Sequence, residues 1–166
     1  GTLKVGDIFI CGSQSSKVRA LLNERNVRIC FLGRRDGRVP KRILKRMEKA
    51  EKLTKNNTGL TFTVAFNYGG RAEIVDAVQK VVDSGVKKVT EKTIERNLYN
   101  QEMPDPDLVI RTSGESRVSN FLLWELAYSE LVFSDTLWPD FSRKDLFYSI
   151  KEFQERDRRF GGLGGS

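Results

Sequence analysis

The sequence contains no histidine among its 166 residues and only two cysteines, Cys11 and Cys30. The absence of histidine excludes Ser-His-Asp and Cys-His nucleophilic catalysis, together with the commonest general base. The two cysteines stand in apolar stretches, with no Cys or His spacing that is typical of zinc sites. We therefore interpret them as buried thiols of a protein from a reducing compartment.

Long apolar runs are also missing. No stretch approaches the roughly 18 residues that a membrane-spanning helix requires, and no basic-then-apolar leader is visible, so we expect no secretory signal. Hydrophobic residues make up 39% of the chain and charged residues 31%. This composition and length predict one soluble domain that can bury a core.

Positive charge is present in excess, with a net charge of +7. Such an excess favours an anionic partner, which could be nucleic acid, a phosphorylated metabolite or an acidic membrane surface. The basic run Lys41-Arg42 and Lys45-Arg46 lies on the polar side of an expected amphipathic helix. We interpret this run as a solvated face and expect no nucleic-acid partner.

Hydrophobic periodicity predicts an alternation of strands and helices. Strands are expected over residues 4–11, 27–32, 60–66 and 108–110, and the end of a helix over residues 18–25. Further helices are expected from Pro40, after the turn Asn67–Arg71, over Thr90–Leu98, over the markedly apolar Phe121–Leu131, and from a capping box at Ser142–Asp145.

This order of elements predicts an α/β fold in which a central parallel sheet is covered by helices. In open sheets of this kind, ligands bind beyond the carboxyl ends of the strands. Two expected loops stand at that edge, Asn67–Arg71 and Arg111–Asn120. Either loop is therefore a candidate for ligand binding.

The second loop has the composition of a phosphate or diphosphate cradle. Arg111 and Arg117 present planar forks of donors that match phosphate oxygens, Gly114 allows a tight turn, and Ser119 lies beside the expected start of a helix, where an anion is favoured. The alternative is a surface loop whose arginines pair with acidic neighbours. The candidate neighbours are Asp105, Asp107 and Glu115.

Several long segments resemble the cis-prenyltransferase family of the undecaprenyl diphosphate synthase type. They are NNTGLTFTVAFNYGGRAEIV, RTSGESRVSNFLLWELAYSELVF, TLWPDF and ERDRRFGG, and they span about Asn26 to Gly162. The resemblance implies a divergent N-terminal segment (1–25) and a cis-prenyltransferase-like α/β domain, C-terminal part (26–161). Composition predicts a flexible Gly-rich tail (162–166).

The resemblance also implies an activity, which is condensation of isopentenyl diphosphate with an allylic diphosphate such as farnesyl diphosphate to make a polyprenyl diphosphate. It implies Mg²⁺ as cofactor, with Glu130 as a metal ligand on the expected apolar helix, and a homodimer formed through that region. The expected location is the cytoplasm, with transient membrane contact. The implied substrate-binding residues are Arg111, Glu115, Arg117, Val118, Ser119, Arg159 and Gly161.

The chain departs from the family pattern at its start. The family's Met-Asp-Gly-Asn-Gly-Arg-Trp-Ala motif, whose Asp organises Mg²⁺ and the allylic diphosphate, is absent, and so is its Ser-x-x-Asn-Trp segment. We interpret Asp36-Gly37-Arg38 as a surface turn and give Asp7 no catalytic role, so the catalytic residue is unknown. A truncated enzyme, a divergent or engineered form, and a non-catalytic partner subunit remain open.

Overall fold

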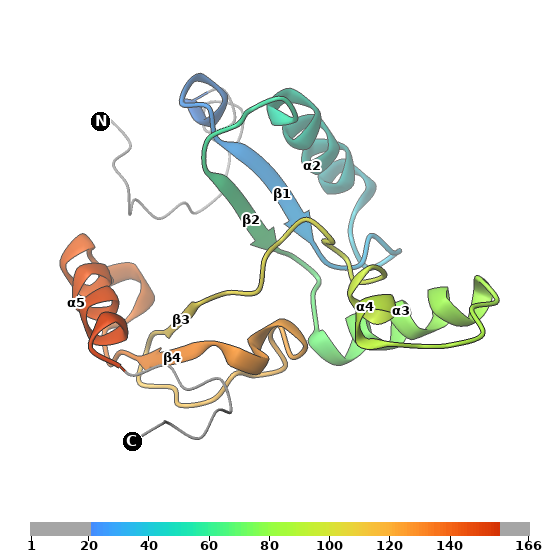
Figure 1. Cartoon of the computed structure of the whole chain (residues 1–166). Helices are drawn as coiled ribbons and strands as arrows, with labels where there is room; N and C mark the ends of the chain where they lie inside the picture. The colour runs from blue at the N-terminus through green and yellow to red at the C-terminus, as the bar shows by residue number, and fades with distance from the viewer. Residues whose placement is uncertain (1–20, 157–166) are drawn as a thin grey trace, which may run out of the picture. The chain divides into compact units, whose positions relative to one another are not determined.

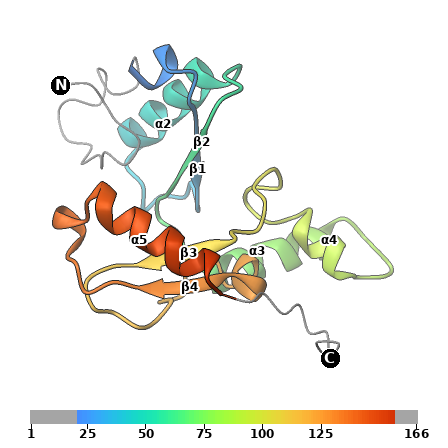
Figure 2. The ribbon, with the colours of Figure 1, turned by 60° about the vertical axis from the view of Figure 1, so that its left-hand side comes forward.

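The computed structural model describes residues 21–156 and divides the chain into two compact units. The described parts of these units are residues 21–102 and 103–156 (Figures 1 and 2). None of the helices in residues 21–156 combines the length and apolar character that crossing a membrane would require.

The first unit contains a parallel pair of strands, β1 (Arg28–Leu32) and β2 (Thr61–Ala65), in register from Arg28 opposite Thr61 to Leu32 opposite Ala65. Helix α2 (Lys41–Thr54) connects them and packs against β1 (Figure 1). A parallel pair needs such a crossover because its strands run in the same direction. The strands and crossover helix confirm the βαβ order expected from the sequence.

The buried side of α2 is fixed to β1 by apolar packing and by one hydroxyl. Leu22, Val27, Ile29 and Ala50 form a core cluster against which Phe31 packs. The buried Thr54 Oγ1 accepts a hydrogen bond from the Ile29 amide at 3.0 Å and donates to the Ala50 carbonyl at 2.9 Å. These bonds pair polar groups that would otherwise be costly to bury.

Two further helices, α3 (Gly70–Asp83) and α4 (Glu91–Glu95), follow β2 and contact each other. Ala77 and Val81 of α3 are buried, and so is Ile94 of α4. Three other valines of α3, Val75, Val78 and Val82, are exposed. The helix expected over Thr90–Leu98 is shorter than predicted, and Thr90 caps it through a reciprocal capping box.

The second unit contains another parallel pair, β3 (Leu108–Arg111) and β4 (Glu130–Phe133), with helix α5 (Arg143–Gln154) in contact with both strands. The predicted capping box is confirmed, because Ser142 and Asp145 bond reciprocally at the start of α5. Two short 3₁₀ helices, η1 (Glu125–Tyr128) and η2 (Trp138–Asp140), complete this unit. Within residues 21–156 the strands thus form two parallel pairs that α-helices contact, which is an α/β arrangement.

The prediction of one apolar helix over Phe121–Leu131 is wrong. Ser119, Asn120 and Leu122 have positive φ angles of 49°, 63° and 43°, which a right-handed helix does not allow. The only helical residues in this stretch are the four of η1, and the chain then enters β4. The apolar run Leu131-Val132-Phe133 is a strand, where its β-branched and aromatic side chains fit well.

Candidate functional site

The candidate diphosphate cradle lies at the carboxyl end of β3. Arg111 is the last residue of that strand, opposite Phe133 of β4, and its carbonyl accepts a hydrogen bond from the Ser134 amide at 2.8 Å. Its side chain is half-buried, and within residues 21–156 it makes no ion pair or side-chain hydrogen bond. Arg111 therefore retains all the hydrogen-bond donors of its guanidinium.

A pocket of about 230 Å³ opens beside Arg111. Arg111 and Arg117 supply its cationic groups, and Val118 is one of its lining residues. The remaining lining residues are apolar: Val109, Ile110, Phe121, Leu126, Leu131 and Phe133. An apolar pocket with a few positioned charges is the usual form of a small-molecule site.

The loop after Arg111 is held in a strained conformation. Ser113 and Ser119 are strained because they have φ angles of 71° and 49°, whereas Gly114 adopts its φ of 67° without strain. The Ser113 and Gly114 amides donate to the carbonyls of Thr136 and Ser134 at 2.9 and 3.0 Å. Such backbone strain persists only where the surroundings enforce it, and it gathers at functional sites.

The backbone of this loop offers further donors. Among the described residues, no acceptor is found for the amide N–H groups of residues 115–119. The helix dipole expected near Ser119 is absent, because no α-helix begins there. Loop amides, rather than a helix N-terminus, are therefore the backbone groups that this segment can offer to an anion.

Arg117 differs from Arg111, because it pairs with Glu115 within the loop. The Arg117 side chain is 68% exposed. The Arg117–Glu115 pair agrees with the alternative prediction of a surface loop whose arginines pair with acidic neighbours. Arg111 does not agree with it, because Arg111 makes no such pair among the described residues. Ser119 is exposed and Val118 half-buried.

Glu130, the implied metal ligand, is the first residue of β4 and does not lie on a helix. Its Oε2 accepts a hydrogen bond from Arg156 Nη1 at 3.0 Å, and the same nitrogen donates to the Leu131 carbonyl at 2.9 Å. No group of three acidic, His or Cys side chains suited to a metal occurs within residues 21–156. One carboxylate that is already paired with arginine does not make a magnesium cage, so the described residues do not fit the ion by themselves.

Other sequence-predicted positions fall outside the site or the described chain. Arg159, Gly161, Asp7 and Cys11 lie outside residues 21–156. Cys30 is a free, half-buried thiol in β1, and burial raises its pKa.

Asp36-Gly37-Arg38 is the expected surface turn. The Asp36 carboxylate accepts hydrogen bonds from the Arg38 amide at 3.0 Å and from the Arg38 guanidinium. These bonds hold the pKa of Asp36 at about 2. The turn thus closes on itself and leaves no carboxylate poised for a substrate.

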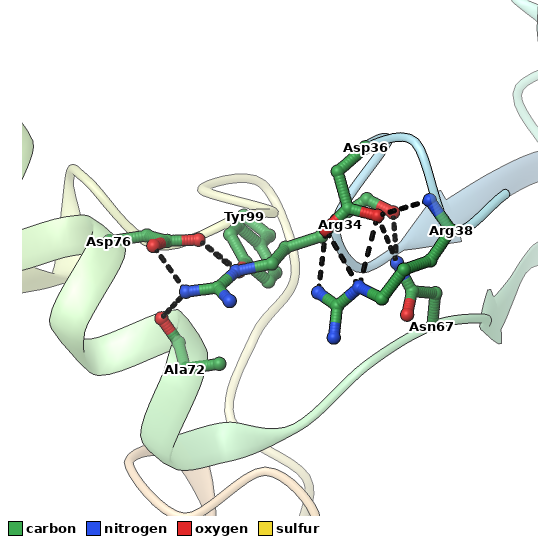
Figure 3. Close-up of polar contacts among 7 residues, drawn as sticks. All are labelled: Arg34, Asp36, Arg38, Asn67, Ala72, Asp76 and Tyr99. Atoms are coloured by element: carbon green, nitrogen blue, oxygen red, sulfur yellow. Dashed lines mark hydrogen bonds and ion pairs between the residues drawn. The ribbon is translucent and has the colours of Figure 1, made fainter.

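The structure contains a second polar cluster that the sequence did not predict. Its hydrogen bonds connect the loops after β1 and β2 to α3 (Figure 3). Arg34 Nη2 and Nε donate to the two carboxylate oxygens of Asp76 at 2.7 and 2.8 Å. The Tyr99 hydroxyl donates to Asp76 at 2.5 Å, and Asn67 donates to the Arg34 carbonyl at 2.8 Å. The Arg34 bonds lower the pKa of Asp76, whereas burial raises that of Tyr99 to about 12.

Glu73 extends this cluster into the interior of the first unit. Only 1% of its surface is exposed, and its carboxylate accepts hydrogen bonds from the Tyr68 hydroxyl and, at 2.9 Å, from the Tyr99 amide. Glu73 and Asp76 are three residues apart on α3, and that spacing was the one signal in the sequence. Their arginine and tyrosine partners come from distant segments, which no local pattern reveals.

Comparison with known proteins places this geometry in a family. Residues 8–161 match the sequence profile of the family described as "Putative undecaprenyl diphosphate synthase". An isoprenyl transferase of Fusobacterium nucleatum is 53% identical over 133 residues, which are 80% of this chain and 57% of that protein. An isoprenyl transferase of Thermotoga maritima is 50% identical over 161 residues, which are 95% of this chain and 68% of that protein. The chain thus spans between half and about two thirds of these relatives.

Solved structures agree with the sequence matches. Lavandulyl diphosphate synthase from Lavandula x intermedia, in complex with dimethylallyl diphosphate, superposes with a TM-score of 0.82 at 34% identity, over 89% of this chain and 66% of that one. An undecaprenyl diphosphate synthase described as probable, from Campylobacter jejuni, superposes with a TM-score of 0.81 at 31% identity, over 89% and 69%. The chain belongs to the undecaprenyl diphosphate synthase family of cis-prenyltransferases.

Proposed function

We propose that this chain acts in a cis-prenyltransferase, which condenses isopentenyl diphosphate with an allylic diphosphate such as farnesyl diphosphate to make a polyprenyl diphosphate. The observation that carries the proposal is Arg111, which is half-buried beside an apolar pocket and has no acidic partner among residues 21–156. Family membership supplies the substrate class.

In this proposal, the diphosphate of isopentenyl diphosphate binds to Arg111 and to the free amides of residues 115–119, while its short apolar chain lies against the pocket wall. Arg117 exchanges Glu115 for the incoming phosphate oxygens, which present a denser negative charge. Val118 and Ser119 complete the loop, and Arg159 and Gly161 are proposed to contribute from the C-terminal segment.

The reaction breaks the allylic carbon–oxygen bond as negative charge grows on the departing diphosphate. Fixed positive groups that meet this charge lower the barrier. The described residues do not fit Mg²⁺ by themselves, so none of them is given a metal role in this step. The residues described here are assigned only to holding and orienting isopentenyl diphosphate. We propose a cytoplasmic homodimer that has transient contact with a membrane.

A non-catalytic subunit of such an enzyme is the second candidate. The observation that favours it is Glu130, because its carboxylate is occupied by Arg156 and no acidic cluster stands nearby among residues 21–156. A subunit of this kind would bind isopentenyl diphosphate or dimerise without turning over.

Turnover separates these two candidates. The purified chain is incubated with Mg²⁺, farnesyl diphosphate and labelled isopentenyl diphosphate, and butanol-extractable label is counted. Extractable product supports catalysis by this chain. Binding of isopentenyl diphosphate without product supports the subunit, and neither binding nor product contradicts the proposed function.

A further inference from the structure

Helix α2 carries most of the chain's net charge. Residues 41–55 hold seven Lys or Arg and two Glu, a net charge of +5, which leaves +2 for all the other residues. The seven basic residues are all exposed: Lys41, Arg42, Lys45, Arg46, Lys49, Lys52 and Lys55. We call these seven residues the α2 basic face.

The α2 basic face covers about half of the helix circumference, as the 3.6-residue repeat places these seven side chains. The opposite side holds the buried Met47, Ala50 and Thr54. The only other residues within the basic half are Glu48 and Leu53, and Leu53 is 50% exposed. The second acid of the segment, Glu51, points away and is bound by Arg35 and the Phe31 amide.

These cations have no partners in the part of the chain that the structure describes. Within residues 21–156, none of the seven makes an ion pair, not even with Glu48 on the same helix. The end of helix α5 differs, because Lys151 pairs with Glu155 and Glu152 with Arg156, both partners lying just beyond the helix. An ordinary solvated face pairs the two signs, whereas the basic half of α2 holds seven cations and one acid, Glu48, which pairs with none of them among the described residues.

The arrangement also opposes the stability of its own helix. Lys41 and Arg42 occupy the first turn, which contains no acidic residue, and Pro40 provides no side-chain cap. Cations at this end face the positive pole of the helix dipole. Repulsion among the neighbouring charges adds to this cost, and an external anionic surface would relieve both effects.

We propose that the α2 basic face docks the protein onto the surface of an anionic lipid bilayer. Clusters of Lys and Arg on an amphipathic helix are drawn to acidic headgroups, and Leu53 provides an apolar side chain within the same face. The face contains no aromatic, Asn or Gln residue that would stack on or read bases, which argues against nucleic acid. The choice of lipid rests on the proposed function, because a polyprenyl diphosphate must pass to a bilayer.

The test is flotation of the full chain with vesicles of phosphatidylcholine alone or mixed with phosphatidylglycerol. The variant Lys45→Gln/Arg46→Gln/Lys49→Gln removes three charges from the centre of the face. The control Lys87→Gln/Lys88→Gln/Lys92→Gln removes three exposed charges outside α2, so both proteins carry +4 in place of +7. Glutamine keeps a similar helix propensity, and circular dichroism checks that both variants are folded.

We expect the wild type and the control to float only with the anionic vesicles, and their binding to fall as salt is raised. The α2 variant should bind on the order of a hundredfold more weakly. Equal losses in both variants would show that net charge alone acts, and no flotation of the wild type would contradict the proposal outright.

Two further measurements keep the outcomes distinct. Tighter retention on duplex DNA than on anionic vesicles, lost in the α2 variant, would make the face a nucleic-acid site and overturn the lipid proposal. Turnover with soluble substrates in detergent does not depend on docking. Flotation without turnover would therefore count against the proposed function but support membrane docking by the α2 basic face. Turnover without flotation would support the proposed function and contradict the docking proposal.

Discussion

Arg34 and Arg111 both stand at the carboxyl ends of parallel strands, yet their surroundings are opposite. Arg34 follows β1 and is bound by both oxygens of Asp76, whereas Arg111 ends β3 beside a pocket and pairs with no acid in the described chain. A guanidinium bound to a carboxylate has its donors occupied, so Arg34 joins two loops to α3. A guanidinium without such a partner keeps its donors for a ligand. An arginine at the carboxyl end of a strand is therefore not by itself a sign of ligand binding. Whether a neighbouring acid pairs with the arginine determines whether its donors are available to a ligand.

The largest loss of stability is expected from a substitution of Glu73, the most deeply buried member of the polar cluster around Arg34 and Asp76. Glu73→Ala would leave the Tyr68 hydroxyl and the Tyr99 amide without their acceptor. We expect the free energy of unfolding to fall by about 3 kcal/mol, since two part-buried donors lose a charged acceptor. Urea denaturation measures the change, and a loss below about 1 kcal/mol would mean that water replaces the carboxylate.

Arg34→Met should lower the urea midpoint by less, because the Arg34–Asp76 pair is about one-third exposed. It should leave the binding of isopentenyl diphosphate unchanged. The matched control is Arg143→Met, which removes an arginine that lies over the Phe147 ring at the surface and should change neither property. If Arg34→Met weakened diphosphate binding while the protein stayed folded, the contrast with Arg111 would be lost.

Arg117→Ala should weaken the binding of isopentenyl diphosphate by about tenfold, since one charge-assisted hydrogen bond is removed. The effect should be smaller than that of removing Arg111, because Arg117 is exposed and must first leave Glu115. Calorimetric titration gives both affinities. Arg117→Lys should recover part of the loss, and unchanged affinity in Arg117→Ala would remove this residue from the cradle.

The smallest expected effect is a change in how stability depends on pH in acidic solution. Arg38 lowers the pKa of Asp36 to about 2, and Arg34 lowers that of Asp76. Because both folded-state pKa values lie below the unfolded value of about 4, these groups stabilise the fold above that pH. Their contribution should disappear as pH falls from about 4 towards 2. Urea midpoints across this range should drop less steeply in Arg34→Met, and an identical slope would contradict the assignment for Asp76.

The local elements were largely predictable from sequence, and the long-range contacts were not. The strands β1, β2 and β3 and the Ser142 cap follow from alternation and spacing that lie within a few residues. The strand β4 was missed because its apolar run has no period that separates a helix from a strand. The positive φ angles of Ser119, Asn120 and Leu122, which stop a helix before it, have no signature in the sequence.

The candidate site was predictable in part for the same reason. The arginines of the loop after β3 stand together in the sequence, so their common chemistry is visible there. The pairing of Arg117 with Glu115 is local, and the sequence offered Glu115 as a candidate partner. The occupation of Glu130 by Arg156, 26 residues further along the chain, depends on a tertiary contact. The sequence thus identified the arginines of the site, but it did not show which of them are free to bind a ligand.

Whether Arg111 is the centre of a diphosphate site is decided by calorimetric titration of the wild-type chain and of Arg111→Met with isopentenyl diphosphate, with urea denaturation run on the same samples. We expect the wild type to bind and Arg111→Met to lose between about tenfold and a hundredfold in affinity. We expect the two proteins to unfold at nearly the same urea concentration. Equal affinities, or a loss of stability in Arg111→Met as large as that in Arg34→Met, would show that Arg111 is another structural arginine and not the centre of a diphosphate site.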